Sequence, residues 1–152
     1  MRTQAPLVLA LAPALLIVGG MLVMSFSGVA PARVELRDGK VRITLRGLMP
    51  IYALRRRLVV PLQDIETVHA DRYAKNLIGG FRIGTHLPKV MTAGTFLRGG
   101  GRGRDFFAVY RAASALVLDI RPEARTYRRV IVEIDDLDAT ASAIDSARST
   151  AR

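Results

Sequence analysis

A long stretch without charge near the start of the chain is the feature that most constrains this protein. No Asp, Glu, Lys or Arg occurs between Arg2 and Arg33, and residues 7–26 are apolar apart from one proline, two glycines and one serine. At about 1.5 Å per residue, a helix of this length spans the roughly 30 Å hydrocarbon core of a bilayer. We therefore predict a transmembrane helix within an N-terminal anchor, residues 1–32, followed by one domain, residues 33–152.

The same segment also permits a cleavable signal peptide. Ala30, Pro31 and Ala32 form an A-x-A cleavage pattern after a basic start. The apolar stretch exceeds the roughly 7–15 residues of a signal-peptide core, which favours a retained anchor. Basic side chains gather between residues 33 and 46, whereas only Arg2 precedes the apolar stretch, so the positive-inside tendency predicts a single-pass cell-membrane protein with a cytoplasmic C-terminal domain. The alternative is a secreted barrel released by cleavage.

Composition limits the chemistry that the chain can perform. The sequence has no cysteine, which excludes disulfides, thiolate metal sites and a cysteine nucleophile. Its net charge is +10, and 22 of its 23 Lys and Arg residues lie in 33–152, which predicts an anionic partner for this domain. Half of all residues are apolar, enough to build one compact core.

Alternation of apolar and polar residues indicates a mainly β domain. Residues 33–37 and 41–46 alternate on either side of Asp38-Gly39, a strong signal for a two-residue hairpin with a basic outer face. About seven short antiparallel strands are expected, bent into a barrel or sandwich. The further strand signals lie at residues 57–62, 65–68, 81–84, 92–97, 105–110, 115–120 and 127–134.

The end of the chain changes to a helical period. Asp136 or Asp138 is placed to cap a helix that runs through Ala147, and Arg148 suits the negative end of its dipole. This helix is expected to cover one open end of the bent sheet. Its predicted buried stripe consists of Leu137, Ala141, Ile144 and Ala147.

The order of these elements is accompanied by several short motifs, namely residues 57–65 (RLVVPLQDI), 84–88 (GTHLP), 92–96 (TAGTF), 106–109 (FFAV) and 130–136 (VIVEIDD). Together they resemble the bacterial pleckstrin-homology-like (PH-like) domains, in particular small membrane-anchored proteins of an actinobacterial type. The resemblance implies a PH-like barrel with a C-terminal helix. It also implies binding or assembly in place of catalysis.

Two clusters of basic residues are the candidate binding site for an anionic surface. Lys40 and Arg42 lie on the first hairpin, and the run Arg55, Arg56 and Arg57 follows the apolar stretch 48–54. An apolar loop beside three arginines can enter the interfacial layer of a membrane, where each cation contributes about 1 kcal/mol with anionic lipid. The alternative is a strand edge whose charges are solvated.

Other patterns do not form a catalytic constellation. The glycine-rich stretch 99–104 lacks the Gly-Lys-Ser/Thr ending of a phosphate loop and precedes a strand pattern, so a hairpin loop is predicted. His69 and His86 lack further residues at metal-ligand spacing. Basic and aromatic residues occur without a nucleic-acid-binding motif, so nucleic acid is not an expected partner.

These observations predict a non-enzymatic, membrane-anchored binding or scaffolding module. Its basic face is expected to lie towards anionic lipid, and a protein partner is expected as well. No cofactor, metal or catalytic residue is predicted. An enzyme-class alternative is a small split-barrel protein that holds a flavin or a similar phosphorylated cofactor through its arginines.

Overall fold

The computed structural model describes residues 29–71, 81–98, 103–110, 114–124 and 126–150. The predicted membrane segment, residues 7–26, lies outside these ranges. Among the described residues, no helix combines the length and the apolar character needed to cross a bilayer.

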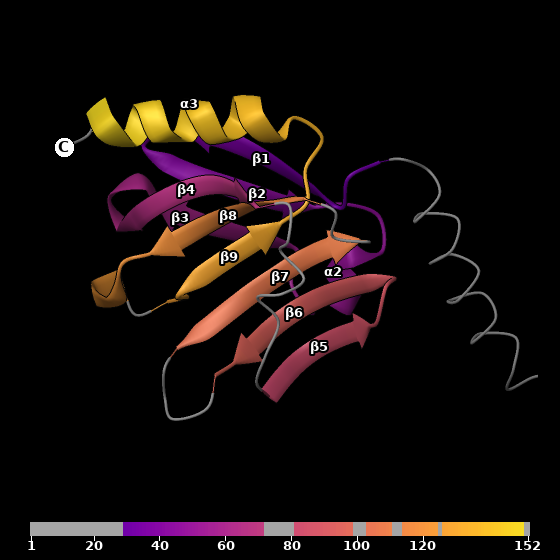
Figure 1. Cartoon of the computed structure of the whole chain (residues 1–152). Helices are drawn as coiled ribbons and strands as arrows, with labels where there is room; N and C mark the ends of the chain where they lie inside the picture. The colour runs from indigo at the N-terminus through magenta and orange to yellow at the C-terminus, as the bar shows by residue number, and fades with distance from the viewer. Residues whose placement is uncertain (1–28, 72–80, 99–102, 111–113, 125, 151–152) are drawn as a thin grey trace, which may run out of the picture.

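The described chain forms two β-sheets and a C-terminal helix (Figure 1). The smaller sheet has the antiparallel order β1-β2-β3, with β1 at Ala32–Arg37, β2 at Lys40–Leu45 and β3 at Arg57–Pro61. The larger sheet has the order β4-β8-β9-β7-β6-β5. Its strands are β4 (Ile65–Asp71), β5 (Phe81–Leu87), β6 (Met91–Leu97), β7 (Arg104–Tyr110), β8 (Ala115–Ile120) and β9 (Arg129–Val132). The helical elements are α2 (Met49–Tyr52), α3 (Leu137–Thr150) and the 3-10 turns η1 (Leu62–Asp64) and η4 (Pro122–Ala124).

This architecture confirms a mainly β domain with a C-terminal helix but differs from the predicted barrel. The described residues form nine strands in two separate, open sheets, whereas about seven strands in an antiparallel barrel or sandwich were predicted. The pairing of β7 with β9 is also parallel. The chain crosses from β7 to β8 and leaves a gap one strand wide, which β9 then fills. Because β9 is antiparallel to β8, it runs in the same direction as β7.

The central strands of the larger sheet are buried on both faces. Phe106 and Val130 belong to the main core, which the two sheets and α3 share, while Phe107 and Ile131 belong to a second cluster on the opposite face. Val130 and Val132 therefore face one side of the sheet and Ile131 faces the other. Burial on both faces explains why these strands are nearly continuous apolar runs.

The helix α3 covers one edge of the larger sheet. It packs against β4, and the Arg148 guanidinium donates a hydrogen bond to the Glu66 backbone oxygen at 2.7 Å. Ile144 is fully buried, and the other three residues of the predicted stripe pack partly buried against the main core. The predicted amphipathic helix is confirmed, and Figure 1 shows it along the edge formed by β4.

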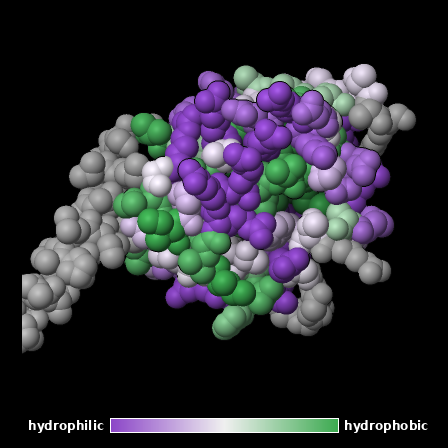
Figure 2. All heavy atoms as spheres, turned by 180° about the vertical axis from the view of Figure 1, so that it is seen from behind, coloured by the Kyte–Doolittle hydropathy of each residue, from purple (hydrophilic) through white to green (hydrophobic). Residues whose placement is uncertain are grey.

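The first hairpin has the predicted two-residue turn. Asp38 and Gly39 both have positive φ, 53° and 67°, as a type I′ turn requires, and Arg37 pairs with Lys40. Val41 and Ile43 are fully buried, whereas Arg42 between them faces outward. Figure 2 shows the outer side of this sheet as a hydrophilic surface bordered by a hydrophobic one.

Candidate functional site

The short helix α2 presents apolar side chains to solvent. It follows β2, and two of its side chains, Met49 and Tyr52, are buried and anchor it to the main core. The other side of the turn is exposed: Ile51 is 65% exposed and Leu54, just after the helix, is 71% exposed. We call Ile51 and Leu54 the apolar turn.

The backbone around the apolar turn ends α2 with a Schellman arrangement. The Arg55 N–H donates to the Pro50 carbonyl at 3.0 Å, and the Leu54 N–H donates to the Ile51 carbonyl at 3.3 Å. This arrangement places Leu54 in the left-handed region with φ 53°, a position that glycine normally occupies. For any residue with a Cβ, this conformation costs about 1–2 kcal/mol. With 71% of its surface exposed, this strained leucine gains little from packing within the described chain.

The five basic residues predicted as an anionic-surface site divide into two groups. Lys40 and Arg42 alternate with buried residues of β2, and Arg57 does the same on β3, so these three side chains leave the smaller sheet on its outer face. The register pairs Arg57 with Thr44, which places it diagonally next to Arg42. Arg56 is exposed at the start of this group, next to the apolar turn.

Arg55 takes a different direction from its neighbours. Its guanidinium lies 5.7 Å from the centre of the Tyr127 ring, and the Arg104 guanidinium lies 5.4 Å from the same ring. The Tyr127 ring also contacts Phe106 edge-on, with 5.8 Å between the ring centres. These contacts hold the segment after α2 against the larger sheet, so Arg55 contributes mainly to positioning the apolar turn.

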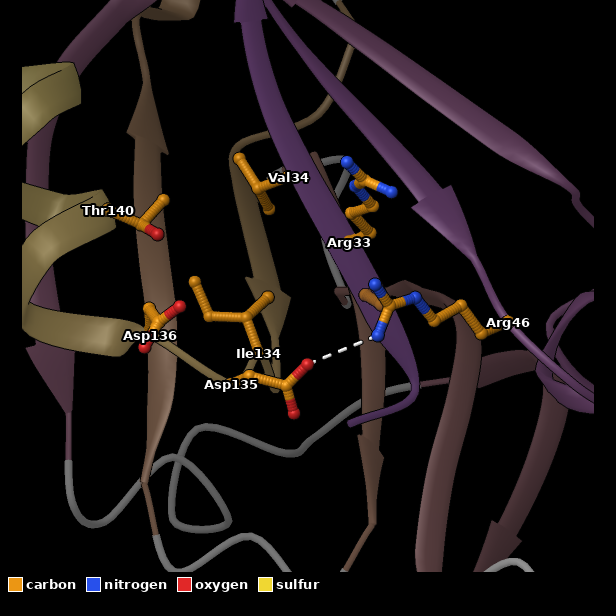
Figure 3. Close-up of a pocket in the computed structure, with 8 residues that line it drawn as sticks. Arg33, Val34, Arg46, Ile134, Asp135, Asp136 and Thr140 are labelled. Carbon is orange, nitrogen blue, oxygen red and sulfur yellow. Dashed lines mark hydrogen bonds and ion pairs between the residues drawn. The ribbon is translucent and has the colours of Figure 1, made fainter. Parts of the chain in front are cut away.

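A small cavity lies where the chain enters the domain (Figure 3). Arg46, just beyond β2, turns towards Asp135 and forms an ion pair of 3.1 Å, and the Ala30 N–H donates to the same carboxylate at 3.2 Å. The cavity has a volume of about 170 Å³, below the roughly 300–1,000 Å³ of small-molecule sites. Its lining residues are Ala32, Arg33, Val34, Arg46, Ile134, Asp135, Asp136 and Thr140.

A buried carboxylate organises the opposite end of the larger sheet. The side chain of Asp105 is 2% exposed and accepts hydrogen bonds from Arg98 Nε at 2.9 Å and from Arg128 Nε at 3.3 Å. Arg129 lies 3.8 Å away on the neighbouring strand. Burial, followed by the nearby Arg128 and Arg98, lowers the pKa of Arg129, although Asp105 opposes this change. The cluster ties the ends of β6, β7 and β9 together.

A second partly buried carboxylate lies at the other end of β9. Glu133 follows this strand, and its Oε2 atom accepts a hydrogen bond from the Tyr110 N–H at 2.6 Å. Burial is the main reason that the pKa of Glu133 is raised to about 7; Asp135 adds to the rise, and the hydrogen bond from Tyr110 acts in the opposite direction. Glu133 therefore changes protonation near neutral pH.

The two histidines lie in different surroundings, and His69 connects through Asp119 to Arg129 of the Asp105 cluster. His69 Nδ1 is 3.8 Å from Asp119, which also accepts a hydrogen bond from Thr67 at 2.6 Å. His86 Nδ1 is 2.9 Å from the Thr92 hydroxyl. Within the described ranges, no group of three or more His, Asp or Glu side chains is arranged to hold a metal ion. Most of the glycine-rich stretch 99–104 lies outside the described residues, and β7 begins at Arg104 as the predicted following strand.

Comparisons with protein-family models, with curated proteins and with solved structures give no match. The function must therefore be argued from the site itself. Sequence reasoning found the basic run and the apolar stretch before it, but it missed the roles of Asp105 and Glu133. In the sequence, Asp105 is one acidic residue at the start of an apolar strand. Glu133 belongs to an acidic stretch with Asp135, Asp136 and Asp138, which is also typical of helix capping and a solvated surface.

Proposed function

We propose that this protein is a non-enzymatic, membrane-anchored binding module whose apolar turn enters the interfacial layer of an anionic membrane. The observation that carries the proposal is Leu54, which is exposed to solvent and held in a left-handed conformation that disfavours leucine. Because both the exposure of this apolar side chain and its backbone conformation are unfavourable, we infer that the side chain contacts a molecule outside the chain. Arginines directly follow Leu54 in the sequence, and their charge attracts anionic lipid headgroups.

The entry point of the chain supports this orientation. Ala30 is 6% exposed and its N–H donates a hydrogen bond to Asp135, so this residue is held against the domain. Only residues 27–29 separate it from the predicted membrane segment, and three residues reach about 10 Å when extended. Arg46, just before α2, donates its backbone N–H to the Pro31 carbonyl at 2.8 Å. The apolar turn therefore belongs to the end of the domain that is tethered closest to the bilayer.

The free energies of leucine and isoleucine burial and of arginine attraction are large enough to orient a domain that is already tethered to the membrane. Full burial of a leucine or isoleucine side chain contributes about 1.5–3 kcal/mol. Each arginine near an anionic surface adds about 1 kcal/mol, and Arg56 and Arg57 are both exposed. Because the predicted anchor already confines the domain to the membrane, this contact has to orient the domain and does not have to recruit it.

A relation to the PH-like domains is part of this proposal. The C-terminal helix packed on a β-rich core supports it. The parallel pair β7–β9 and the two open sheets depart from the predicted closed antiparallel barrel. The proposed contact with lipid therefore depends on the apolar turn and its arginines and not on the family.

Tryptophan substitution tests the proposal, because the chain contains no tryptophan. Full-length protein carrying Ile51→Trp is reconstituted into vesicles of phosphatidylcholine, with or without phosphatidylglycerol, that contain brominated lipid as a quencher. Phe81→Trp is the matched control, because Phe81 is 73% exposed but starts β5 at the far end of the domain.

We expect blue-shifted and bromine-quenched emission from Ile51→Trp in the anionic vesicles, and solvent-exposed emission from Phe81→Trp. Replacing Arg56 and Arg57 with glutamine should reduce the quenching of the Ile51→Trp reporter. Equal quenching at both positions, or none at position 51, would contradict the proposed orientation.

A further inference from the structure

Among the described residues, the larger sheet has one protected edge and one open edge. At the first edge, β4 carries an irregular register between Ile65 and Thr67 and is covered by α3, whose Arg148 hydrogen-bonds the backbone of Glu66. Both features are known means of blocking unwanted strand pairing. At the other edge, β5 pairs only with β6 among the described strands.

The open edge carries an apolar stripe with the period of a strand. Phe81, Ile83 and Leu87 alternate with polar or small residues and are 73%, 49% and 38% exposed. The register places this face of β5 beside Met91 and Ala93 of β6, which belong to the main core. The face of β5 therefore continues the core surface but lies beyond the part that the smaller sheet covers.

The charged residues of the β5–β6 hairpin are all basic, and one of them, Arg98, is paired with Asp105. Residues 81–98, which form the β5–β6 hairpin, contain Arg82, Lys89 and Arg98 but no acidic residue. Within the described part of the chain, neither Arg82 nor Lys89 forms an ion pair. Arg82 alternates with Phe81 and Ile83, so its side chain leaves β5 on the face opposite to the apolar stripe.

We propose that β5 is a strand-addition site for an extended segment of a partner protein, with apolar residues at alternate positions and acidic residues between them. Backbone hydrogen bonds at the edge would supply affinity, and alternate side chains would supply specificity. In an added strand, the apolar residues would lie beside Phe81 and Ile83, and the acidic residues beside Arg82. The proposal goes beyond the contact with lipid and does not depend on it.

A second copy of this chain fits the same edge less well. The strand β5 runs from Phe81 at the far end of the domain to Leu87 at the end where the chain enters. Antiparallel pairing of two copies would turn one domain upside down relative to the other. Two chains held in the same membrane face by the proposed N-terminal anchor cannot adopt that arrangement, whereas a partner segment has no such restriction; the restriction rests on the proposed function.

Two fluorescent peptides test the proposal with full-length protein in nonionic detergent micelles. One peptide alternates valine with glutamate over ten residues, and the other alternates valine with lysine. We expect fluorescence anisotropy to show at least tenfold tighter binding of the glutamate peptide. Arg82→Glu should abolish or reverse this preference. Arg37→Glu, which changes the charge equally on the exposed side of the other sheet, should leave it unchanged, and circular dichroism verifies the fold of each variant.

Cysteine cross-linking then locates the peptide, because the native chain contains no cysteine. A glutamate peptide with a central cysteine should form a disulfide with Thr85→Cys on β5 and not with Thr67→Cys on the protected strand β4. Absence of peptide binding, an unchanged preference in Arg82→Glu, or equal cross-linking at both positions would overturn the proposal. Disulfide dimers of Thr85→Cys that form without peptide would overturn it in favour of self-association.

Discussion

The carboxylate of Glu133 makes the stability of the fold depend on pH in a predictable direction. Burial raises its pKa from 4.5 to about 7, so the folded protein binds this proton more tightly than the unfolded chain does. The contribution of Glu133 to stability is complete below pH 4.5 and is lost as the pH rises through 7. Over this interval the loss sums to about 3 kcal/mol, which solvent screening of the partly exposed group reduces to about 2 kcal/mol.

The variant Glu133→Gln isolates this effect. Glutamine keeps an oxygen that can accept the hydrogen bond from the Tyr110 N–H, but it does not ionise. We expect the free energy of unfolding of the wild type, measured by urea denaturation of the full chain in micelles, to fall relative to the variant between about pH 4.5 and 7.5. The variant should be the more stable protein at the upper end of this range, by about 2 kcal/mol. A constant difference across this range would refute the role assigned to burial.

Three further substitutions follow from the geometry. Leu54→Gly should raise the free energy of unfolding by about 0.5–1 kcal/mol, because glycine adopts φ 53° without strain. The same substitution should reduce bromolipid quenching of the Ile51→Trp reporter. A loss of stability would contradict the strain argument. Gly94→Ala should lower the free energy of unfolding in urea by about 2–3 kcal/mol, because Gly94 has φ 122° and an added Cβ would lie 2.7 Å from the Gly84 Cα. Gly39→Ala is the control and should cost less, because no atom lies within 4 Å of the added Cβ. Asp105→Asn should cost about 2–3 kcal/mol by removing the charge that three arginines share, against about 0.5 kcal/mol for the exposed Glu35→Gln; equal effects would exclude a special role for Asp105.

The local elements were predictable because each has a pattern of its own. Alternation or a short apolar run indicated a strand near each strand of the described chain, and Asp38-Gly39 located a turn that requires two residues at positive φ. The amphipathic stripe around Ile144 located α3. These signals are short-range, since they depend on side-chain direction within one element.

The arrangement of the strands was not predictable in the same way. An apolar run such as that of β7 indicates burial on both faces, but it does not name the neighbouring strands. The parallel pairing of β7 and β9 depends on the crossover to β8, which leaves no local signal. The prediction of a closed barrel failed at this point.

The candidate site was predictable only in part. The sequence identified the basic run and the apolar stretch before it, because both are contiguous. The direction of Arg55 towards Tyr127 and the left-handed conformation of Leu54 depend on contacts between distant segments and on the end of one helical turn. Predicting the role of Arg82 as a charge on an edge strand would also have required the strand order, which the sequence does not reveal.

The position of β8 and β9 has a consequence for biosynthesis. These two strands lie between β4 and β7 in the larger sheet and consist of residues within 115–132. The strand β4 therefore has no partner in this sheet until β8 has been translated. At about 5–20 residues per second, β4 waits several seconds after synthesis for its neighbour β8. A ribosome-arrested chain that ends after β7 would contain two disconnected strand groups with uncovered apolar faces, and quality-control proteases should degrade it faster than the finished protein.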